Sequence, residues 1–301
     1  MQEFLKEVEK EEIGKIVKEE FLSKYTSYKV GGLARCIIYP KNVTKLVQLC
    51  RLIKKYQLPF MILGNGTNVL FSDKAYEGVI IKLDMFNVIE FMGNKVRVQA
   101  GASLMRVASM AARRGLTGLE FASGIPGTVG GAIYMNAGAY KSDMGYIVQN
   151  VTVLTPDLRI INMTNKEMDF HYRSSYLQQH PGYICLEAIL KLEYGDRKEI
   201  EKVNKDRKAR RLVSQPLEYP SAGSVFRNPE GQYAGKLIED LGLKGLTKGG
   251  AMVSDKHANF IINKNQASAK DIHDLILFVR DAVKEHYGIE LKIEQEFVNW
   301  E

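Results

Sequence analysis

The apolar positions of this chain alternate between runs that favour strands and spacings that favour helices. Leu46, Leu49, Cys50 and Ile53 follow the spacing of one helix face. Short apolar runs bounded by glycine or proline predict strands; the main ones end at Pro40 or cover residues 60–63, 79–83, 96–100, 150–155, 184–193, 258–263 and 290–298. Helices and strands are therefore mixed along the whole chain, which indicates an α+β fold.

The ends of two further helices are predicted by local signals. Residues 104–111 place apolar side chains at helical spacing, and Gly115 can end that helix in the left-handed conformation. Ser268 and Asp271 form a capping-box pair that begins a second helix, and Gly288 can end it.

The charged stretch 197–211 is typical of an exposed helix and separates the first set of elements from the second. A chain of 301 residues exceeds the usual size of one hydrophobic core. We therefore expect a helical lead-in at residues 1–28, a first domain at residues 29–195 and a smaller α+β domain at residues 196–301. In the last of these, a short helix is expected around Leu237.

The net charge of +7 raises the question of a nucleic-acid partner. The basic residues are mixed with acidic ones, however, and the longest basic cluster, residues 205–211, fits the exposed face of a helix. We expect no nucleic-acid partner, because a basic protein that binds polyanionic small molecules explains the charge equally well.

The three cysteines, Cys36, Cys50 and Cys185, are few and widely spaced. This pattern favours a reducing compartment and predicts neither a disulfide framework nor a zinc site. The charged N-terminal segment lacks the apolar core of a signal peptide, and no apolar run approaches membrane-spanning length. We expect a cytoplasmic protein with no bound metal, no membrane insertion and no obligate protein partner.

Residues 64–73, GNGTNVLFSD, directly follow a predicted strand. Glycines at this place let backbone N–H groups approach a pyrophosphate, and Thr67 and Asn68 can add side-chain hydrogen bonds. A type I′ hairpin turn at Asn65 and Gly66 is the alternative interpretation. The segment lacks the third glycine of a dinucleotide fingerprint, and the chain has no Walker A pattern.

Residues 118–140, GLEFASGIPGTVGGAIYMNAGAY, form a second glycine-rich segment without regular periodicity. Gly124, Gly127 and Gly131 would let the backbone pass close to a flat cofactor. A flexible surface loop is the alternative, but apolar residues such as Ile133 would not be left in water. We therefore expect a ligand-binding segment.

These two segments in this order, preceded by VGG at residues 30–32, resemble the UDP-N-acetylenolpyruvoylglucosamine reductase family. The resemblance extends from Tyr25 to Val298. It implies an FAD-binding domain of the vanillyl-alcohol-oxidase (PCMH) type followed by a smaller α+β substrate domain. The residues that it assigns to FAD are Gly64, Asn65, Gly66, Thr67, Asn68, Ser123, Gly124, Ile125, Gly127, Thr128 and Gly131. Relatives usually carry serine where this chain has Thr67, so the hydroxyl is kept.

The resemblance also assigns catalytic and substrate-binding residues. Arg173 in HYRSSYL matches a catalytic arginine, whose planar guanidinium can clamp a carboxylate, and Ser224 in QPLEYPSAGSVFRNP matches a proton donor. Taken alone, the arginine would be a surface or packing residue, and the Gly-Ser pair an ordinary turn. The substrate-binding residues implied are Tyr172, Asn228 and His257, although a structural histidine is the alternative for the last.

The catalytic glutamate is assigned within the C-terminal strand. Glu294 and Glu296 lie two apart and would face the same side of a strand, so spacing alone does not choose between them. The family's pattern of glycine, leucine and glutamate falls without gaps on Gly288, Leu291 and Glu294. We therefore assign Glu294. Relatives usually have valine next, where this chain has Gln295.

The implied reaction uses FAD and NADPH to reduce the enolpyruvyl double bond of a UDP-amino-sugar, a step of peptidoglycan precursor synthesis. The charged connector at residues 193–215 resembles the shorter of two forms of the family. A flavin oxidase of the same fold is one alternative, but neither glycine-rich segment contains a histidine or cysteine that could tether FAD. A non-enzymatic nucleotide-binding module is another, and the joint presence of Arg173, Ser224 and Glu294 argues against it.

Overall fold

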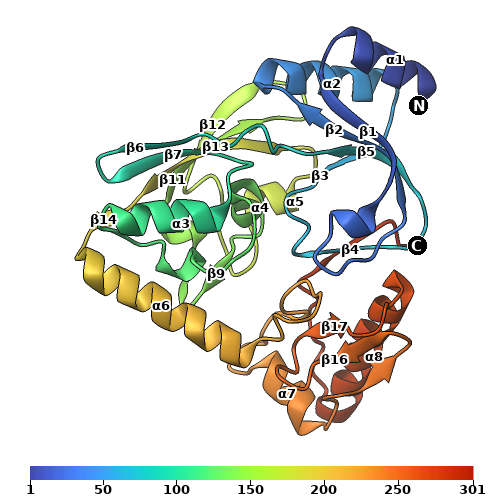
Figure 1. Ribbon diagram of the computed structural model, residues 1–301, viewed down its shortest axis with the longest axis vertical. Helices are drawn as coiled ribbons and strands as arrows, with labels where there is room; N and C mark the ends of the chain where they lie inside the picture. The colour runs from blue at the N-terminus through green and yellow to red at the C-terminus, as the bar shows by residue number, and fades with distance from the viewer. Residues whose placement is uncertain (301) are drawn as a thin grey trace. The chain divides into compact units, whose positions relative to one another are not determined.

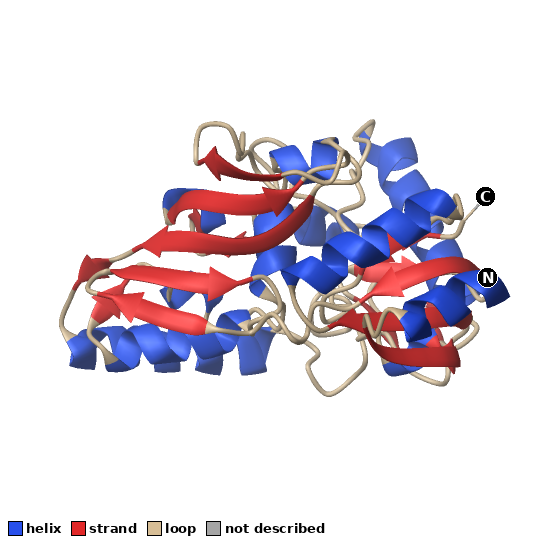
Figure 2. Ribbon diagram, turned by 90° about the horizontal axis from the view of Figure 1, so that it is seen from above, coloured by secondary structure: helices blue, strands red, loops and turns tan. Residues whose placement is uncertain are grey.

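A computed structural model describes residues 1–300 of the chain. The chain divides into two compact units. Unit 1 comprises residues 1–18, 36–64 and 78–209, and unit 2 comprises residues 19–35, 65–77 and 210–301. Helices and strands are mixed throughout (Figure 2), so the expected α+β class is confirmed.

The helices within the described residues are α1 (Gln2–Lys10), α2 (Val43–Lys55), α3 (Leu104–Arg113), α4 (Val129–Tyr134), α5 (Tyr176–Gln179), α6 (Arg197–Ser214), α7 (Ala234–Asp240) and α8 (Ala269–Tyr287). Short 3-10 helices are η1 (Leu22–Lys24), η2 (Glu120–Ala122) and η3 (Met144–Tyr146). The strands are β1 (Gly14–Phe21), β2 (Leu33–Pro40), β3 (Phe60–Ile62), β4 (Val69–Phe71), β5 (Tyr76–Ile81), β6 (Ile89–Met92), β7 (Lys95–Gln99), β8 (Leu116–Thr117), β9 (Gly138–Ala139), β10 (Ser142–Asp143), β11 (Val148–Leu154), β12 (Ile160–Thr164), β13 (Ile184–Lys191), β14 (Glu193–Tyr194), β15 (Thr247–Lys248), β16 (Ala251–Val253), β17 (Ile261–Asn263) and β18 (Glu296–Val298).

The largest sheet of unit 1 has five strands in the order β12-β11-β13-β7-β6, and all neighbours are antiparallel. The apolar sequence of β13, ICLEAILK, is buried at most positions, as expected for a strand inside a sheet. Helices α3 and α4 lie on one face of this sheet (Figure 1). A Cβ on Gly130 of α4 would lie 2.9 Å from that of Ala100, so glycine lets α4 pack closely against the end of β7.

The N-terminal segment folds differently from its predicted form. Helix α1 forms, and its Phe4 and Val8 are fully buried in a cluster with Leu46 of α2. The expected helical lead-in over residues 1–28 is wrong beyond α1, because Glu12 takes a left-handed φ of 48° and strand β1 follows. The sequence of β1, GKIVKEEF, mixes charged and apolar residues without strict alternation, so its periodicity does not distinguish a strand from a helix.

In unit 2, the three-stranded sheet β15-β16-β17 packs against the long helix α8. Both predicted ends of α8 are confirmed: Ser268 and Asp271 form the capping box, and Gly288 takes a left-handed φ of 68°. A second cap was not predicted. The Asp73 carboxylate accepts hydrogen bonds of 2.9 and 3.0 Å from the first two amides of α8. Asp73 therefore has a structural role as a cap of α8, although it is the last residue of the glycine-rich segment 64–73.

Other differences from the predicted elements are local. Helix α4 lies inside residues 118–140, where no helix was expected, since its two glycines lower helix propensity. The predicted strand at 290–298 is regular only as β18, which pairs in parallel with β4. Residues 29–35 and 65–77 group with the C-terminal residues of unit 2, whereas the expected domains were continuous.

Candidate functional site

The glycine-rich loop after β3 makes a close approach inside unit 1. A Cβ on Gly64 would lie 2.8 Å from the hydroxyl oxygen of Thr128, so only glycine fits there without a shift. The Gly64 carbonyl accepts a 2.6 Å hydrogen bond from the ammonium of Lys82, which is 6% exposed. The two glycine-rich segments of the sequence thus meet at Gly64 and Thr128, next to a nearly buried lysine that sequence patterns did not single out.

The next part of the same loop belongs to unit 2 and also requires glycine. Gly66 has a φ of 64°, and a Cβ there would lie 2.1 Å from the carbonyl oxygen of Tyr25. Its own carbonyl accepts a 2.9 Å hydrogen bond from the amide of Ser27. The hairpin interpretation of Asn65 and Gly66 is wrong, because β3 pairs with β5 and β4 pairs with β18.

The second glycine-rich segment is held firmly in unit 1. Thr128 is the N-cap of α4 and accepts a 3.3 Å hydrogen bond from the amide of Gly131. The Gly127 carbonyl accepts a 3.0 Å bond from Leu104, the first residue of α3. Val129 and Ile133 are fully buried, so the segment is not a flexible surface loop. Ser123 and Ile125 form a turn before α4, where their amides bond to Glu120 and Ala122.

Both loops offer backbone amides to a ligand. Within residues 1–300, six of the amides assigned to FAD make no hydrogen bond to the protein, and they belong to Gly64, Gly66, Thr67, Gly124, Gly127 and Thr128. Backbone N–H groups without a protein partner are the donors that phosphate oxygens need. At Gly64 and Gly66 of the first loop, the absence of a Cβ lets the backbone fit into a crowded place. Each loop taken by itself therefore fits a phosphate group such as those of a dinucleotide.

Arg173 lies at the tip of a tight turn in unit 1. His171 and Ser174 close the turn with two reciprocal 3.0 Å backbone hydrogen bonds. Arg173 has a φ of 56°, a conformation that is uncommon for a residue with a side chain and concentrates at functional sites. Its guanidinium donates a 2.7 Å bond to the Gly138 carbonyl and lies 5.0 Å from the ring centroid of Tyr172, which is 51% exposed.

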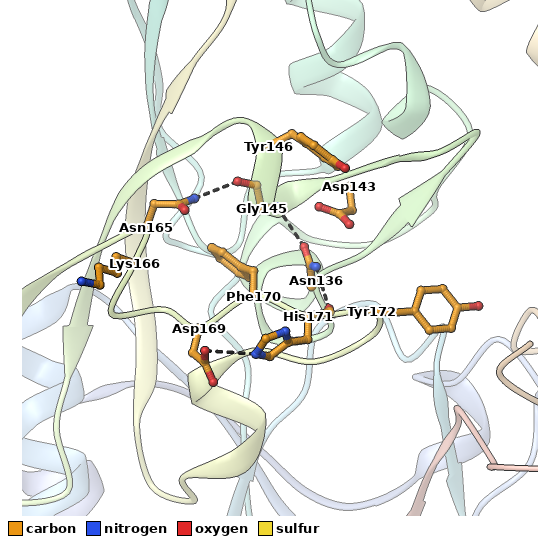
Figure 3. A pocket seen from close by; sticks show the side chains of 10 residues that line it. All are labelled: Asn136, Asp143, Gly145, Tyr146, Asn165, Lys166, Asp169, Phe170, His171 and Tyr172. Carbon is orange, nitrogen blue, oxygen red and sulfur yellow. Dashed lines mark hydrogen bonds and ion pairs between the residues drawn. The ribbon is translucent and has the colours of Figure 1, made fainter. Parts of the chain in front are cut away.

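A buried asparagine fastens this turn to the glycine-rich segment. Asn136 donates a 2.8 Å hydrogen bond to the carbonyl of His171 and accepts a 2.9 Å bond from the amide of Gly145 (Figure 3). Ser175 adds a 2.7 Å bond to the carbonyl of Tyr134. The turn also borders a cavity of about 390 Å³, lined by Asn136, Asp143, Gly145, Tyr146, Asn165, Lys166, Asp169, Phe170, His171 and Tyr172. Sequence patterns missed Asn136, since its partners are not local.

Unit 2 brings together three residues that are distant in the sequence. The amide of Glu294 donates a 2.8 Å hydrogen bond to the carbonyl of Val225, the residue after Ser224. The side-chain amide of Asn68 donates a 3.1 Å bond to the carbonyl of Glu294. Ser224 is half-buried, and within residues 1–300 its hydroxyl makes no hydrogen bond. Asn68, a predicted FAD residue, therefore lies close to the predicted catalytic residues Ser224 and Glu294 in unit 2.

The neighbouring glutamates differ in their backbone contacts. Glu294 lies before β18 and bonds to the segment that carries Ser224, whereas Glu296 begins β18 and donates from its amide to the carbonyl of Asn68. Between them Gln295 is 5% exposed and points into the core. Both glutamates are half-buried. The backbone of Glu294 is thus bonded directly to the segment that carries Ser224.

The remaining substrate-binding candidates already have structural contacts. The side-chain oxygen of Asn228 accepts a 3.1 Å hydrogen bond from the first amide of α7. His257 packs on Phe260 with ring centroids 4.8 Å apart, and burial lowers the pKa of its imidazole. Its Nδ1 accepts a 3.2 Å bond from the amide of Asn259, which places the proton of the neutral ring on Nε2.

The cysteines are buried thiols in the described part of the chain. Burial raises the pKa of Cys36 to about 11 and that of Cys50 and Cys185 to about 12, so all three stay protonated at neutral pH. Residues 1–300 contain no cluster of three side chains suited to a metal ion. None of the helices described in this range has the length and apolar character to cross a membrane.

Two family models match the chain. An FAD binding domain matches residues 34–164, and the C-terminal domain of UDP-N-acetylenolpyruvoylglucosamine reductase matches residues 215–298. A UDP-N-acetylenolpyruvoylglucosamine reductase of Caldanaerobacter subterraneus subsp. tengcongensis is 47% identical over 98% of this chain and 96% of its own length. The enzyme of the same name from Bacillus subtilis is 42% identical over 99% of both chains.

Solved structures give the same result. The crystal structure of UDP-N-acetylenolpyruvylglucosamine reductase from Thermus caldophilus matches with a TM-score of 0.81 and 35% identity, over 94% of this chain and 98% of that one. An alkyldihydroxyacetonephosphate synthase, at 17% identity and a TM-score of 0.50 over 64% of this chain, shares the fold alone. The chain therefore belongs to the UDP-N-acetylenolpyruvoylglucosamine reductase family, with an FAD-binding domain followed by the C-terminal domain of that family.

Proposed function

We propose that this chain uses FAD and NADPH to reduce UDP-N-acetylglucosamine enolpyruvate to UDP-N-acetylmuramate, a step of peptidoglycan precursor synthesis. The observation that carries the proposal is the convergence of Asn68, Ser224 and Glu294 in unit 2, from three distant parts of the sequence. In the same proposal, residues 29–195 serve FAD and residues 196–301 serve the substrate. The enzyme works in the cytoplasm on small molecules, without nucleic acid, membrane insertion or an obligate protein partner.

The two glycine-rich loops provide the cofactor site. FAD, when bound, supplies hydride transfer from NADPH to the substrate double bond. The amides of Gly64, Gly66 and Thr67 on one loop, and of Gly127 and Thr128 on the other, would donate to its phosphate oxygens. The carbonyls of Gly64, Gly66 and Gly127 already accept hydrogen bonds from the protein, so the loops are held in place before the ligand arrives and little ordering is needed on binding.

Arg173 would bind the carboxylate of the enolpyruvyl group. A guanidinium presents five N–H donors in a planar fork that matches a carboxylate in two parallel bonds. The bond to Gly138 and the closed turn at His171 and Ser174 fix the position of the fork. Addition of hydride places negative charge on the carbon that carries this carboxylate, and a positioned cation stabilises that charge as it develops.

Ser224 would protonate that carbon. A hydroxyl is a weak acid, so it serves as a proton donor only to a strong base, and the enolate formed by hydride addition is one. Glu294, whose backbone bonds to the residue after Ser224, would in its protonated form donate a hydrogen bond to the developing enolate and so complete the charge stabilisation. Tyr172, Asn228 and His257 would contact the rest of the substrate.

The proposal is tested with the purified protein under anaerobic conditions. It should be yellow, lose its flavin absorbance on addition of NADPH and regain it on addition of UDP-N-acetylglucosamine enolpyruvate, with UDP-N-acetylmuramate detected by mass spectrometry. Flavin should leave the protein on acid precipitation, because residues 64–73 and 118–140 contain no histidine or cysteine.

Two outcomes would support the alternatives instead. Reoxidation by oxygen but not by the enolpyruvyl substrate would indicate a flavin oxidase of the same fold. Flavin that NADPH does not reduce, with tight nucleotide binding retained, would indicate a binding module without catalysis.

A further inference from the structure

A buried network of hydrogen bonds in unit 2 ends at the serine segment, residues 222–226, which contains Ser224. Tyr28 is fully buried, and its hydroxyl lies 3.0 Å from the side-chain oxygen of Gln295, which is 5% exposed. The side-chain nitrogen of Gln295 lies 3.2 Å from the carbonyl of Ala222 and 3.4 Å from that of Gly223. These two carbonyls belong to the residues just before Ser224.

The direction of every bond in this network is determined by chemistry. Backbone carbonyls only accept hydrogen bonds, so the NH₂ group of Gln295 must face Ala222 and Gly223. The amide oxygen therefore faces Tyr28 and accepts from its hydroxyl. Burial raises the pKa of Tyr28, which keeps the phenol protonated and able to donate. The glutamine thus has one orientation.

The serine is held from its other side as well. Asn259, which is 4% exposed, accepts at its backbone carbonyl from the amide of Val225 and at its side-chain oxygen from the amide of Phe226, both at 2.9 Å. Gly223 has a φ of 77°, a conformation that glycine adopts without strain. Ser224 therefore lies between two hydrogen-bonded pairs of residues. Gln295 holds Ala222 and Gly223 on one side, and Asn259 holds Val225 and Phe226 on the other.

We propose that Gln295 is a positioning residue for proton transfer: its side-chain amide holds the Ala222 and Gly223 carbonyls so that the Ser224 hydroxyl meets the substrate carbon. This inference rests on the proposed function of Ser224. Gln295 also follows Glu294 directly, so one residue sets the backbone on both sides of the candidate site. No proton passes through Gln295, because a side-chain amide neither gains nor loses a proton near neutral pH.

The test compares Gln295→Met, which keeps the length of the side chain and removes all three hydrogen bonds, with Ser268→Ala. The latter loses the N-cap of α8 and lowers stability away from the serine segment. After anaerobic reduction by NADPH, reoxidation by the enolpyruvyl substrate should be about tenfold slower in Gln295→Met, since small misplacements of a catalytic group are costly. Reduction by NADPH should stay within about twofold of the parent, because that step needs no proton from Ser224.

Two further readouts separate positioning from loss of stability. The solvent deuterium isotope effect on reoxidation should rise in Gln295→Met and stay unchanged in Ser268→Ala, because proton transfer becomes more rate-limiting only in the former. Hydrogen exchange at the amides of Val225 and Phe226 should become faster in Gln295→Met than in Ser268→Ala. If Gln295→Met fails to fold, Tyr28→Phe, which removes only the far bond, should show the same changes to a smaller degree.

The outcomes distinguish this inference from the proposed function. A parent enzyme that the enolpyruvyl substrate does not reoxidise would overturn the proposed function and with it the role of Ser224. With an active parent, equal slowing of both half-reactions, or exchange at Val225 and Phe226 no faster than in Ser268→Ala, would overturn the positioning role of Gln295.

Discussion

At the scale of single residues, the two glutamates near the serine segment differ in backbone contacts more than in exposure. Alternation along an extended segment puts Glu294 and Glu296 on the side opposite the buried Gln295. Glu296 is fixed by β18, whereas Glu294 is bonded to the residue after Ser224. This contact favours Glu294 as the residue that acts with Ser224.

Replacement of each glutamate by glutamine tests this assignment. Glu294→Gln should lower kcat by roughly a hundredfold, as expected when a group that stabilises the transition state is altered. Glu296→Gln should change kcat by no more than a few-fold, roughly the effect of a neighbouring charge. Steady-state kinetics with saturating NADPH measure both, and the reverse ranking would show that Glu296 is the catalytic glutamate.

Gly66 gives a prediction about stability. Gly66→Ala should cost at least about 2 kcal/mol, because the new Cβ would meet the Tyr25 carbonyl and the φ of 64° is unfavourable for alanine. Gly242 is a matched control: its φ is 69°, but nothing lies within 4 Å of its Cβ position. Gly242→Ala should therefore cost only about 1 kcal/mol. Urea unfolding measures both, and equal costs would contradict the close approach at Gly66.

The residues that sequence patterns missed share one property: their partners lie far along the chain. Tyr28 and its partner Gln295 are 267 residues apart, and Asp73 caps a helix 196 residues later. Periodicity and turn signals report only local spacing, so no pattern indicated these contacts. Arg173 and Ser224 were found only through the resemblance, because an arginine in a turn and a Gly-Ser pair carry no specific local signal.

At the scale of elements, helix α8 is stabilised by groups at its ends and along its exposed face. Lys270 and Asp274 lie one turn apart, with their charged groups at 2.7 Å. Hydrogen bonding from Lys270, aided by His273, lowers the pKa of Asp274 from 3.8 to about 2, although burial opposes the shift. The charged form of Asp274 is therefore favoured in the folded state.

The sign of the pH dependence follows from this lowered pKa. The contribution of Asp274 to stability is complete above its ordinary pKa of 3.8 and is lost as the pH falls through about 2. The side chain is 23% exposed, so solvent screening reduces the contribution to about 1 kcal/mol. Asp274→Asn should lower the Tm at pH 5, and the difference in Tm between the parent and the variant should narrow as the pH approaches 2.

Thermal unfolding between pH 5 and pH 2.5 measures this effect. Glu285→Gln, an exposed position on the same helix, is the control and should show no such narrowing. A difference in Tm for Asp274→Asn that stays constant over this range would contradict the proposed ion pair.

Elements were predictable where their signals are local. The ends of α8 followed from Ser268, Asp271 and Gly288, because caps act within one turn. β1 was mistaken for helix, since mixed charged and apolar residues fit both periods over a short segment. Helix α4 escaped prediction because close packing on Ala100, and not propensity, allows its glycines.

At the scale of the whole molecule, the grouping of segments explains why the site could be predicted only in part. Residues 19–35 and 65–77 belong to unit 2 together with the C-terminal part of the chain. A boundary inferred from the charged stretch around α6 assumes that each domain is one continuous segment. Composition does not indicate that two N-terminal segments belong to the C-terminal unit. The contact of Asn68 with Glu294 is a direct consequence of this grouping.

The most direct test of the proposed reaction separates its two halves in the Ser224→Ala variant. Reduction by NADPH needs no proton from the serine, so the flavin absorbance should disappear at the rate of the parent enzyme. Reoxidation by UDP-N-acetylglucosamine enolpyruvate should slow by about a hundredfold to ten-thousandfold, the usual cost of losing a general acid. Anaerobic stopped-flow absorbance follows both steps. Equal slowing of the two steps, or an unchanged reoxidation, would contradict the role of Ser224 as the proton donor in this reduction.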